Sequence, residues 1–594
     1  MVLNAPDLWE HAYTHIYARP GNMTAGVSGQ TIDGYSEERA ANIRELLREN
    51  RYEPTPVRRV YIPKANGKMR PLGIPDANDK QVQEVWRMIL EALYEPQGRE
   101  DTIPNGFKDS SHGFRPKRSC HTALEEIRHK WTGVKWFIEF DIEGFFDNID
   151  HQILMGLLEK KIDDVKFLNV IRKMLKAGYM EDWKFHKTHS GTPQGGIVSP
   201  ILANIYLHEL DSFVEGLISK YNKGKGRQIN PEYNAIAKRA SRLNPKIQQA
   251  QDQERDTLLE EKRTLQRRML EIPSTDQYDP GYRRLRYCRY ADDFLLGVIG
   301  PKSEAVSLME SIQAFLQGAL RLKHSEAKTG LKHNSDVIRF LGYDITVINS
   351  EKIVKSVYHG QHVKRRAGKA HITLYCPEER LRKFATDRLY GNWETMRGLH
   401  KTFLMQASDV EITKQYSTEL RGMAEYYKLA NNFAKALWKL QFLWRQSYLK
   451  TLAAKHDTSV QKMVDTLNRG SYLAVRVYGK SGEIRHEEKL FDLKSVDREK
   501  QSDDEVDSLP LVMQYTVRTE LQERRDARRC EYCKKEEGYF EVHHIRKLAD
   551  IAKGKAPWEK LMIARRRKTL VLCIECHDRL HAGTLPDRRF LLKE

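Results

Sequence analysis

Three aspartates in this chain have the surroundings that metal-dependent chemistry on phosphate requires. Asp141 directly follows the apolar run Lys135–Phe140. Asp292 and Asp293 are adjacent and stand between two further apolar runs. Neighbouring carboxylates beside buried strands repel each other and resist desolvation, and a bound cation relieves both costs. Two Mg²⁺ ions about 3.5–4 Å apart, held by such oxygens, can steady the charge that develops in phosphoryl transfer. A solvated Asp-Asp turn is the alternative interpretation.

Cysteine and histidine are concentrated near the C-terminus in a pattern that predicts bound metal. Two Cys-x2-Cys pairs have the spacing of a tetrahedral zinc site, formed by Cys530, Cys533, Cys573 and Cys576. His577 and His581 lie one helical turn apart, so both can reach one ion. His543 or His544 can join them. Zinc would replace a hydrophobic core in so small a module, and a zinc finger that only binds DNA is the alternative.

The length and composition of the chain limit its class. With 594 residues it exceeds one ordinary core, and we expect three or more structural units. The formal charge of +19 favours nucleic acid, because basic side chains release counterions from a phosphate backbone. Seven cysteines, an odd number, argue against a disulfide framework.

The apolar content predicts a protein with no membrane partner. No run approaches the roughly 18 apolar residues that a membrane helix needs. The start, MVLNAPDLWEHAYTH, lacks the basic-then-apolar order of a secretory signal. We therefore expect a soluble protein of the cytoplasm.

Strands and turns are predicted where the three acids need them. The segment 57–74 has the pattern of strand, turn and strand, and its Asn66-Gly67 is typical of a hairpin. A short strand at 135–140 and a hairpin at 289–298 would deliver the acids to one cleft. Helices are expected at 81–94, 149–177 and 198–215.

Other stretches differ in character from this core. Residues 223–280 are polar, charged and poor in aromatics, which predicts an inserted helical arm with a basic, solvated face or a partly disordered one. Residues 380–456 carry apolar side chains at spacings of three and four, as in the core of a helical domain. The acidic stretch 502–508 has the composition of a linker.

Six segments occur in an order that resembles the reverse transcriptases encoded by group II introns. They are IPKANGKMRPLGIP at Ile62, SHGFRPKRSCHTAL at Ser111, FDIEGFFDNIDH at Phe140, GTPQGGIVSPILANIYL at Gly191, RYADDFLLG at Arg289 and FLGY at Phe340. The resemblance implies an α/β (α+β) right-hand polymerase, with fingers and palm in residues 1–350 and an insertion at about 223–280. It also implies that Asp141, Asp292 and Asp293 are the Mg²⁺ ligands of an RNA-directed DNA polymerase.

The same resemblance implies further residues that bind nucleotide or template. Cations on the fingers hairpin would neutralise a triphosphate, and an aromatic ring under the sugar would exclude a 2′-hydroxyl. Glycine in the PQGG loop would let the backbone approach closely. The implied nucleotide-binding residues are Lys64, Arg70, Ile142, Phe146, Gln194, Gly195 and Lys328. Arg115 is expected to contact phosphate. A core position for Phe146 and a plain surface position for Lys328 are the alternatives.

Residues 360–456 resemble the α-helical thumb, or maturase, domain of the same family. The matching segments are TELRGMAEYYKLANN at Thr418 and LWRQSYLKTLAAKH at Leu443. The residues expected to face nucleic acid are Arg421, Tyr426, Tyr427 and Lys455. A thumb that only grips the primer–template duplex is the alternative to one that also binds intron RNA. Residues 457–527 correspond in order to a basic DNA-binding connector.

Residues 528–594 resemble an HNH, or ββα-metal, endonuclease stabilised by zinc. The resemblance implies that His544 is the general base and that a divalent ion, expected to be Mg²⁺, lies among His543, His577 and His581. The asparagine that orients the base in this family is replaced by Lys568-Thr569, which puts the efficiency of strand cleavage in doubt.

Together these regions predict a group II intron-encoded protein that combines three activities. It would copy RNA with dNTPs, bind its cognate intron RNA to assist splicing, and nick target DNA to prime reverse transcription during intron mobility. An RNA-binding splicing maturase without polymerase activity is the first alternative. A reverse transcriptase of a defence system is the second, but an HNH module would not be expected there.

Overall fold

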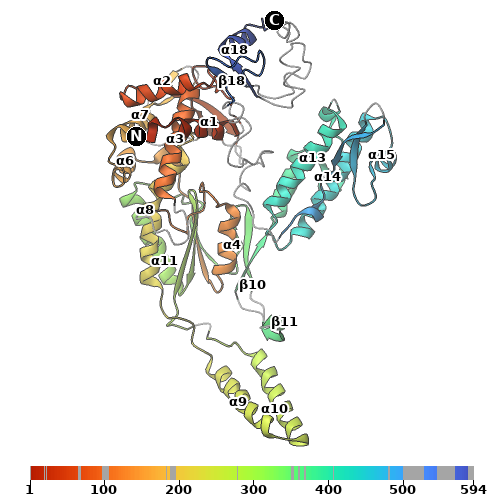
Figure 1. Ribbon diagram of the computed structural model, residues 1–594. Helices are drawn as coiled ribbons and strands as arrows, with labels where there is room; N and C mark the ends of the chain where they lie inside the picture. The colour runs from red at the N-terminus through yellow and green to blue at the C-terminus, as the bar shows by residue number, and fades with distance from the viewer. Residues whose placement is uncertain are drawn as a thin grey trace.

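The protein is an elongated molecule in which helices pack around two four-stranded sheets, and smaller sheets of two or three strands accompany them (Figure 1). The structure, a computed structural model, describes residues 2–18, 21, 23–63, 69–95, 106–181, 184–186, 195–276, 279–348, 353–358, 361–366, 370–405, 407–478, 482–498, 527–544 and 569–585. Among these residues, no helix is long and apolar enough to span a bilayer.

The fingers region packs helices against a four-stranded sheet of order β2-β1-β4-β5. Its strands are β1 (Val57–Pro63), β2 (Met69–Ile74), β4 (Tyr179–Glu181) and β5 (Lys184–His186). Its helices are α1 (Pro6–Ala18), α2 (Glu37–Arg48), α3 (Ala77–Tyr94), α6 (His151–Glu159) and α7 (Val165–Lys176). Trp86 of α3 is fully buried and stacks on Phe167 of α7, which joins the two helices. The predicted hairpin is confirmed, since Ile62 pairs with Arg70.

The palm is an antiparallel sheet of order β6-β7-β3-β8 with helices on both faces. Its strands are β3 (Trp136–Phe140), β6 (Arg284–Tyr290), β7 (Asp293–Ile299) and β8 (Gly330–His333). Its helices are α4 (Cys120–Lys130), α5 (Phe145–Asn148), α8 (Ser199–Tyr221) and α11 (Lys302–Ala319). Along β7, Phe294 and Leu296 join the core beneath α8 and α11, while Leu295 joins the core beneath α4. Alternate side chains of a strand point to opposite faces, so coverage of both faces explains why β7 has no charged residue after Asp293.

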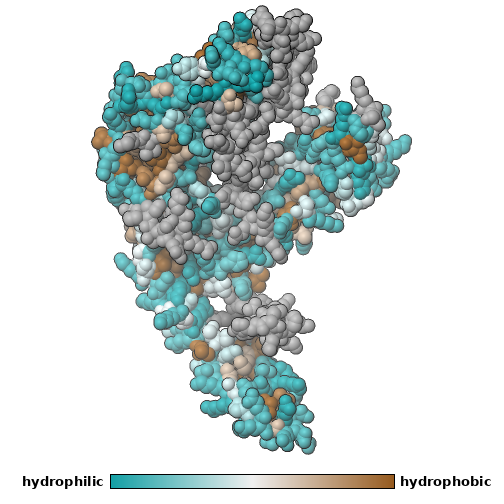
Figure 2. All heavy atoms as spheres, in the orientation of Figure 1, coloured by the Kyte–Doolittle hydropathy of each residue, from teal (hydrophilic) through white to brown (hydrophobic). Residues whose placement is uncertain are grey.

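The inserted segment is a pair of antiparallel helices that projects from the palm (Figure 1). These helices are α9 (Pro231–Gln249) and α10 (Asp252–Glu271). Asn230 caps α9 by accepting a hydrogen bond from the Glu232 N–H, and Pro231 suits the first helical position. Only three side chains of α9 are buried and α10, described over its whole length, buries none. Figure 2 shows the resulting hydrophilic surface of this arm, and of the two predicted states the helical one is observed.

The helical region after the palm shares one continuous core with it. Tyr343 at the palm edge packs in the same cluster as Tyr416 and Trp444. The helices are α12 (Glu378–Asp387), α13 (Asp409–Tyr426), α14 (Phe433–Lys455) and α15 (Val460–Leu467). The strands are β9 (Ile338–Phe340), β10 (Tyr343–Ile348), β11 (Ile353–Tyr358), β12 (Gln361–Arg366), β13 (His371–Tyr375), β14 (Gly391–Asn392), β15 (Arg397–Gly398), β16 (Ala474–Tyr478) and β17 (Ile484–Lys489). The apolar stripe of α14 is buried, which confirms core packing.

The described part of the predicted connector, 457–498, packs on this helical region. Val475 of β16 and Phe491 lie in the same core as α13 and α14. The backbone N–H of Phe491 donates a hydrogen bond to Ser417 of α13. The first half of the connector is therefore a continuation of the helical domain.

The C-terminal module is a small ββα unit. It consists of β18 (Phe540–His544), β19 (Thr569–Cys573) and α18 (Ile574–His581). Among the described residues of the module, Tyr532 and a few leucines surround the cysteines. Figure 1 shows the module against α1 and α2, and an isolated bridge between Tyr35 and Val542 joins it there.

Candidate active sites

The palm sheet brings the three predicted acids together. In the pairing of β3 with β7, Phe140 lies opposite Phe294, so Asp141 emerges beside Asp293. In the pairing of β6 with β7, Tyr290 lies opposite Asp293, which leaves Ala291 and Asp292 as the turn. The turn is tight, because Ala291 has a left-handed φ of 56°. The predicted hairpin with acids at its tip is therefore observed.

The carboxylates have more negative charge among them than the protein neutralises. Burial, followed by the charges of Asp292 and Asp141, raises the pKa of Asp293 to about 7. Burial and the charge of Asp141 also raise the pKa of Asp292. The Lys328 ammonium donates a 2.8 Å hydrogen bond to Asp141 and offsets part of this charge. An all-oxygen group of this kind fits Mg²⁺.

A buried ion pair holds the hairpin that carries Asp292 and Asp293 in place. Arg289 is completely buried beneath the turn, and its guanidinium makes 2.8 and 2.7 Å hydrogen bonds to both oxygens of Asp211 on α8. It also donates to Asn204, Ser111 and the Ala291 carbonyl. The contacts to Asp211, Asn204 and Ser111 tie the hairpin to other elements, and the contact to Ala291 braces its turn, so Arg289 positions the acids without touching them. Arg289 is the first residue of the RYADDFLLG segment. A charged residue in a strand that was expected to be buried could have indicated an internal ion pair.

The loop with the sequence SHGFRP packs directly on the catalytic turn. His112 donates its backbone N–H to Arg289, and Ser111 forms a parallel bridge with the same residue. A Cβ atom on Gly113 would lie 2.4 Å from the Ala291 nitrogen, far inside van der Waals contact. Glycine at this position therefore permits the loop to support the turn that carries Asp292.

Replacing Gly113 with alanine is expected to lower dNTP incorporation about 100-fold, because a displacement of about 1 Å at a reacting centre costs that much. Gly216 of α8 is the matched control, since a Cβ there meets nothing within 4 Å. The incorporation rate of Gly113→Ala and of Gly216→Ala, measured on the same primed RNA, checks this. Equal rates for the two variants would show that the close contact has no role.

Several predicted nucleotide-binding residues lie around the acids. Arg70 is exposed on β2, and its charge acts to lower the pKa of Asp292, although burial raises it more. Ile142 is buried next to Asp141 and bridges to His324. Phe146 of α5 is half-buried, and its ring lies 5.3 Å from that of Phe145.

The loop at 191–196 meets the fingers through a glycine. Gly195 has a φ of 103°, and a Cβ there would lie 2.7 Å from Leu72 and 2.8 Å from the Gly73 carbonyl of β2. Only glycine therefore allows this approach. Gln194 and Lys64 lie outside the described residues.

Three of the residues predicted to contact nucleic acid, namely Arg115, Tyr426 and Tyr427, instead make hydrogen bonds within the protein. Arg115 is buried, pairs with Glu95 at 2.8 Å and donates to two backbone carbonyls, so a phosphate contact does not fit its position. The Tyr426 and Tyr427 hydroxyls donate to the Leu341 and Gly342 carbonyls. They join the thumb to the palm, and the burial of Tyr427 excludes it as a stacking platform.

The other two predicted thumb contacts differ in accessibility. Lys455 donates to the Ala407 carbonyl and to Asp409 at 2.6 Å, which ties the end of α14 to the start of α13. Arg421 is exposed, with its guanidinium 5.2 Å from the Phe491 ring, and it remains available to nucleic acid.

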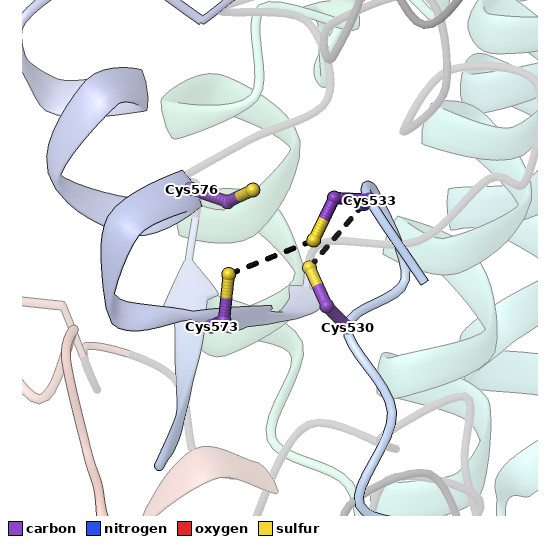
Figure 3. A group of neighbouring side chains, drawn as sticks. All are labelled: Cys530, Cys533, Cys573 and Cys576. Atoms are coloured by element: carbon purple, nitrogen blue, oxygen red, sulfur yellow. Dashed lines mark hydrogen bonds between the residues drawn. The ribbon is translucent and has the colours of Figure 1, made fainter. Parts of the chain in front are cut away.

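The four predicted cysteines converge on one point, as Figure 3 shows. Cys530 and Cys533 come from a turn, whereas Cys573 and Cys576 flank the start of α18. The sulfur atoms of Cys533 and Cys573 are 3.7 Å apart. Thiolates about 2.3 Å from a tetrahedral zinc ion would be about 3.8 Å apart, so the cluster fits zinc. A hydrogen bond from Cys576 lowers the pKa of Cys530 to about 4, which favours the thiolate that binds metal.

A second potential metal site gathers three of the predicted histidines and one unpredicted acid. His543, His577 and His581 lie with Asp33 so that one ligand atom of each falls within 4.8 Å of the others. Burial lowers the pKa of His577, but hydrogen bonds with Asp33 and Glu541 outweigh it and raise this pKa to about 9. The side chains of His544 and Thr569, and all of Lys568, lie outside the described residues. Asp33 carries no motif that the sequence could have revealed.

Comparison with known families assigns these regions. Residues 62–222 match the reverse transcriptases (RNA-dependent DNA polymerases). Residues 371–513 match the type II intron maturases, and residues 530–577 match the AI2M/AI1M-like HNH endonucleases. Together with the palm acids, these matches define the class: a reverse transcriptase that carries maturase and HNH endonuclease domains.

Individual relatives narrow the class further. The chain is 40% identical over 582 residues to the group II intron-encoded protein LtrA of Lactococcus lactis subsp. cremoris, covering 96% of this chain and 93% of LtrA. It is 31% identical to an uncharacterized 91 kDa protein in the cob intron of Schizosaccharomyces pombe, covering 98% of this chain and 69% of that one. A putative COX1/OXI3 intron 1 protein of Saccharomyces cerevisiae is also 31% identical, over 79% of this chain and 54% of that protein. The chain belongs to the group II intron-encoded proteins.

Proposed function

We propose that Asp141, Asp292 and Asp293 hold two Mg²⁺ ions that serve DNA synthesis on an RNA template. The observation that carries this proposal is the convergence of three carboxylates at the start of β7 and the end of β3, of which Asp141 and Asp292 are half-buried. Bound Mg²⁺ would activate the primer 3′-oxygen and stabilise the charge on the phosphate. Lys328 lies within 2.8 Å of Asp141, where its ammonium can neutralise departing pyrophosphate.

The surrounding residues would select and orient the dNTP. Arg70 projects from the fingers toward the acids as a partner for the triphosphate. Lys64 and Gln194 are proposed to assist on the resemblance alone. Phe146 would lie under the sugar and exclude a 2′-hydroxyl, while Gly195 and the Ile142 backbone would border the nucleotide.

We propose that the protein works as a ribonucleoprotein with its cognate intron RNA in the cytoplasm. The net charge of +19 and exposed Arg421 support contact with a phosphate backbone. Binding of the intron would assist its splicing. During mobility the excised intron RNA would insert into one strand of target DNA.

The HNH module would nick the other strand and so provide the primer. The four-cysteine cluster would hold structural zinc, and a divalent ion among the histidines would supply a Lewis acid for phosphodiester cleavage. His544 is proposed as the general base. The free 3′ end would then enter the palm, which explains why nuclease and polymerase occur in one chain.

Replacing His577 with alanine separates the two activities. The reconstituted ribonucleoprotein is mixed with duplex target DNA labelled on both strands and with dNTPs. We expect His577→Ala to abolish nicking, since it removes a buried ligand of the divalent ion, and therefore to abolish cDNA on intact DNA. A target that already carries the nick should restore cDNA synthesis.

The exposed residue Asp578, next in sequence, provides the control Asp578→Asn. This variant should nick and copy as the wild type does. Nicking retained by His577→Ala would contradict the proposed nuclease centre. Failure on the nicked target would instead point to a general loss of folding.

A further inference from the structure

The histidine centre of the HNH module is completed by an acid from the opposite end of the chain. Oδ2 of Asp33 lies 2.9 Å from Nε2 of His581 and 3.3 Å from Nδ1 of His543. The same oxygen lies 3.5 Å from Nε2 of His577. Nε2 of His577 and Nε2 of His581 are 3.2 Å apart. One carboxylate oxygen therefore faces three imidazole nitrogens.

These separations match the edges of a tetrahedral coordination site. Nitrogen and oxygen ligands about 2.0–2.1 Å from a tetrahedral zinc ion lie about 3.3 Å from one another. The observed separations run from 2.9 to 3.5 Å. Imidazole ligands suit zinc and its late first-row neighbours, whereas Mg²⁺ prefers oxygen. The donor set therefore favours a transition-metal ion over the Mg²⁺ that the family resemblance implied.

We propose that Asp33 is the fourth ligand of this ion, and that it docks the HNH module on the fingers and closes the ion to DNA. Catalytic zinc sites keep one coordination position open, whereas sites with four protein ligands are closed. The Asp33 carboxylate takes the position that a phosphate oxygen would need. This inference rests on the proposed assignment of the three histidines as the nuclease metal centre.

The contacts around Asp33 form a built interface. The backbone N–H of Gly34 donates to the Val542 carbonyl, and the N–H of Val542 donates to the Tyr35 carbonyl, both at 3.3 Å. Val542 is fully buried in the same core as Tyr35, whose ring stacks on Tyr13 of α1 at 4.0 Å. The module is thus fastened to the fingers at Val542, the residue that precedes His543.

Neighbouring side chains also fix the ligands themselves. Nη1 of Arg39 donates to the Asp33 carbonyl at 3.1 Å, and the Asp33 N–H donates to Thr31 at 3.2 Å. On the module, Glu541 pairs with Nδ1 of His577, which turns Nε2 toward Asp33. A ligand held by a second partner is already oriented before the metal binds.

The arrangement makes nuclease activity depend on the position of the module. In the docked state the ion has four protein ligands, so no coordination position is left for a phosphate oxygen of DNA. When the module leaves the fingers, Asp33 stays behind and one position opens. Nicking would therefore be withheld until the module is drawn onto target DNA.

Binding of Co²⁺ to the histidine centre tests the role of Asp33. The experiment uses the full-length chain with zinc in its cysteine site. The visible absorption of bound Co²⁺, titrated against a competing chelator, gives the affinity. We expect Asp33→Ala to weaken Co²⁺ binding at least as much as the about 10-fold lost with an outer-shell partner. Amide exchange should rise at 34–35 and 542, and nicking of free plasmid without intron RNA should become faster than in wild type.

Two variants make the outcomes distinguishable. Glu38→Ala removes an exposed acid from α2 nearby and should behave as wild type in each assay. Retained extension of a primed RNA shows that Asp33→Ala is folded.

If His577→Ala loses Co²⁺ while Asp33→Ala binds it as wild type does, the fourth-ligand assignment is overturned and the histidine centre stands. If His577→Ala also binds Co²⁺ normally, the proposed nuclease centre itself fails. Weaker binding without faster nicking overturns the closing role of Asp33.

Discussion

Asp292→Asn is expected to lower dNTP incorporation by at least about 1,000-fold, which corresponds to about 4 kcal/mol of transition-state stabilisation. Asp292 lies at the turn between β6 and β7, beside Asp141 and Asp293. An amide keeps the shape of the side chain but removes the charge that two adjacent cations require. The fold should tolerate the change, because burial and the charge of Asp141 already disfavour an ionised Asp292. Incorporation of labelled dNTP on a primed RNA template measures the effect.

Splicing of the intron RNA separates loss of chemistry from loss of structure. Asp292→Asn should support splicing as wild type does, because Arg421, the proposed RNA contact, lies on α13 and outside the palm turn. Glu326→Gln, an exposed acid in the segment that precedes Lys328, is the matched control and should extend normally. Incorporation within tenfold of wild type would contradict the two-metal assignment. A wild-type protein that splices but never incorporates dNTP would favour the splicing maturase without polymerase activity.

The polymerase acids were predictable because local sequence determines where they lie. A strand that ends on Asp141 and a hairpin whose tip is Asp292 need only pair in register to bring the carboxylates together. The apolar runs on both sides of Asp292 and Asp293 indicated the hairpin that β6 and β7 form. The order of six motifs then supplied the fold and family, which the comparisons confirmed.

Residues that act through distant contacts were much harder to assign. Arg115 stands in a quoted motif and was expected on phosphate, but its guanidinium pairs with Glu95, 20 positions away. The partner of Arg289, Asp211, lies 78 positions away on another element. Neither pairing follows from helical or strand periodicity, since both depend on how α8, the palm and the loop at 106–119 pack.

Asp33 is the clearest case of a site residue that the sequence could not reveal. It is 548 positions from His581, and its segment has the composition of an ordinary polar turn. The spacing of the histidines alone predicts a metal site. The acid opposite them becomes a candidate ligand only when the two domains are in contact. Sequence thus identifies a site when each contributing segment has a recognisable pattern of its own, and structure is needed when one group comes from a segment without such a pattern.

Cys573→Ser is expected to unfold the HNH module and leave the polymerase intact. In the part of the module that the structure describes, few apolar side chains besides Tyr532 and Leu570 surround the cysteines, so the cysteines occupy the place of a hydrophobic centre there. Structural zinc supplies about 10–16 kcal/mol to small zinc-dependent modules. That exceeds or equals the about 5–15 kcal/mol by which whole domains are stable. Serine is a poor substitute for thiolate, so loss of one ligand should release the ion.

Limited proteolysis and zinc content measure the outcome. Cys573→Ser should lose its tightly bound zinc, expose the module to cleavage near 530–580 and fail to nick target DNA. Extension of a primer supplied in place of the nick should continue at the wild-type rate, because the cluster around the four cysteines contains no palm residue. Glu575→Gln, an exposed residue between the two cysteines of the same pair, is the control and should keep zinc and nicking. A Cys573→Ser protein that retains zinc, protease resistance and nicking would show that the four cysteines have no structural metal to hold.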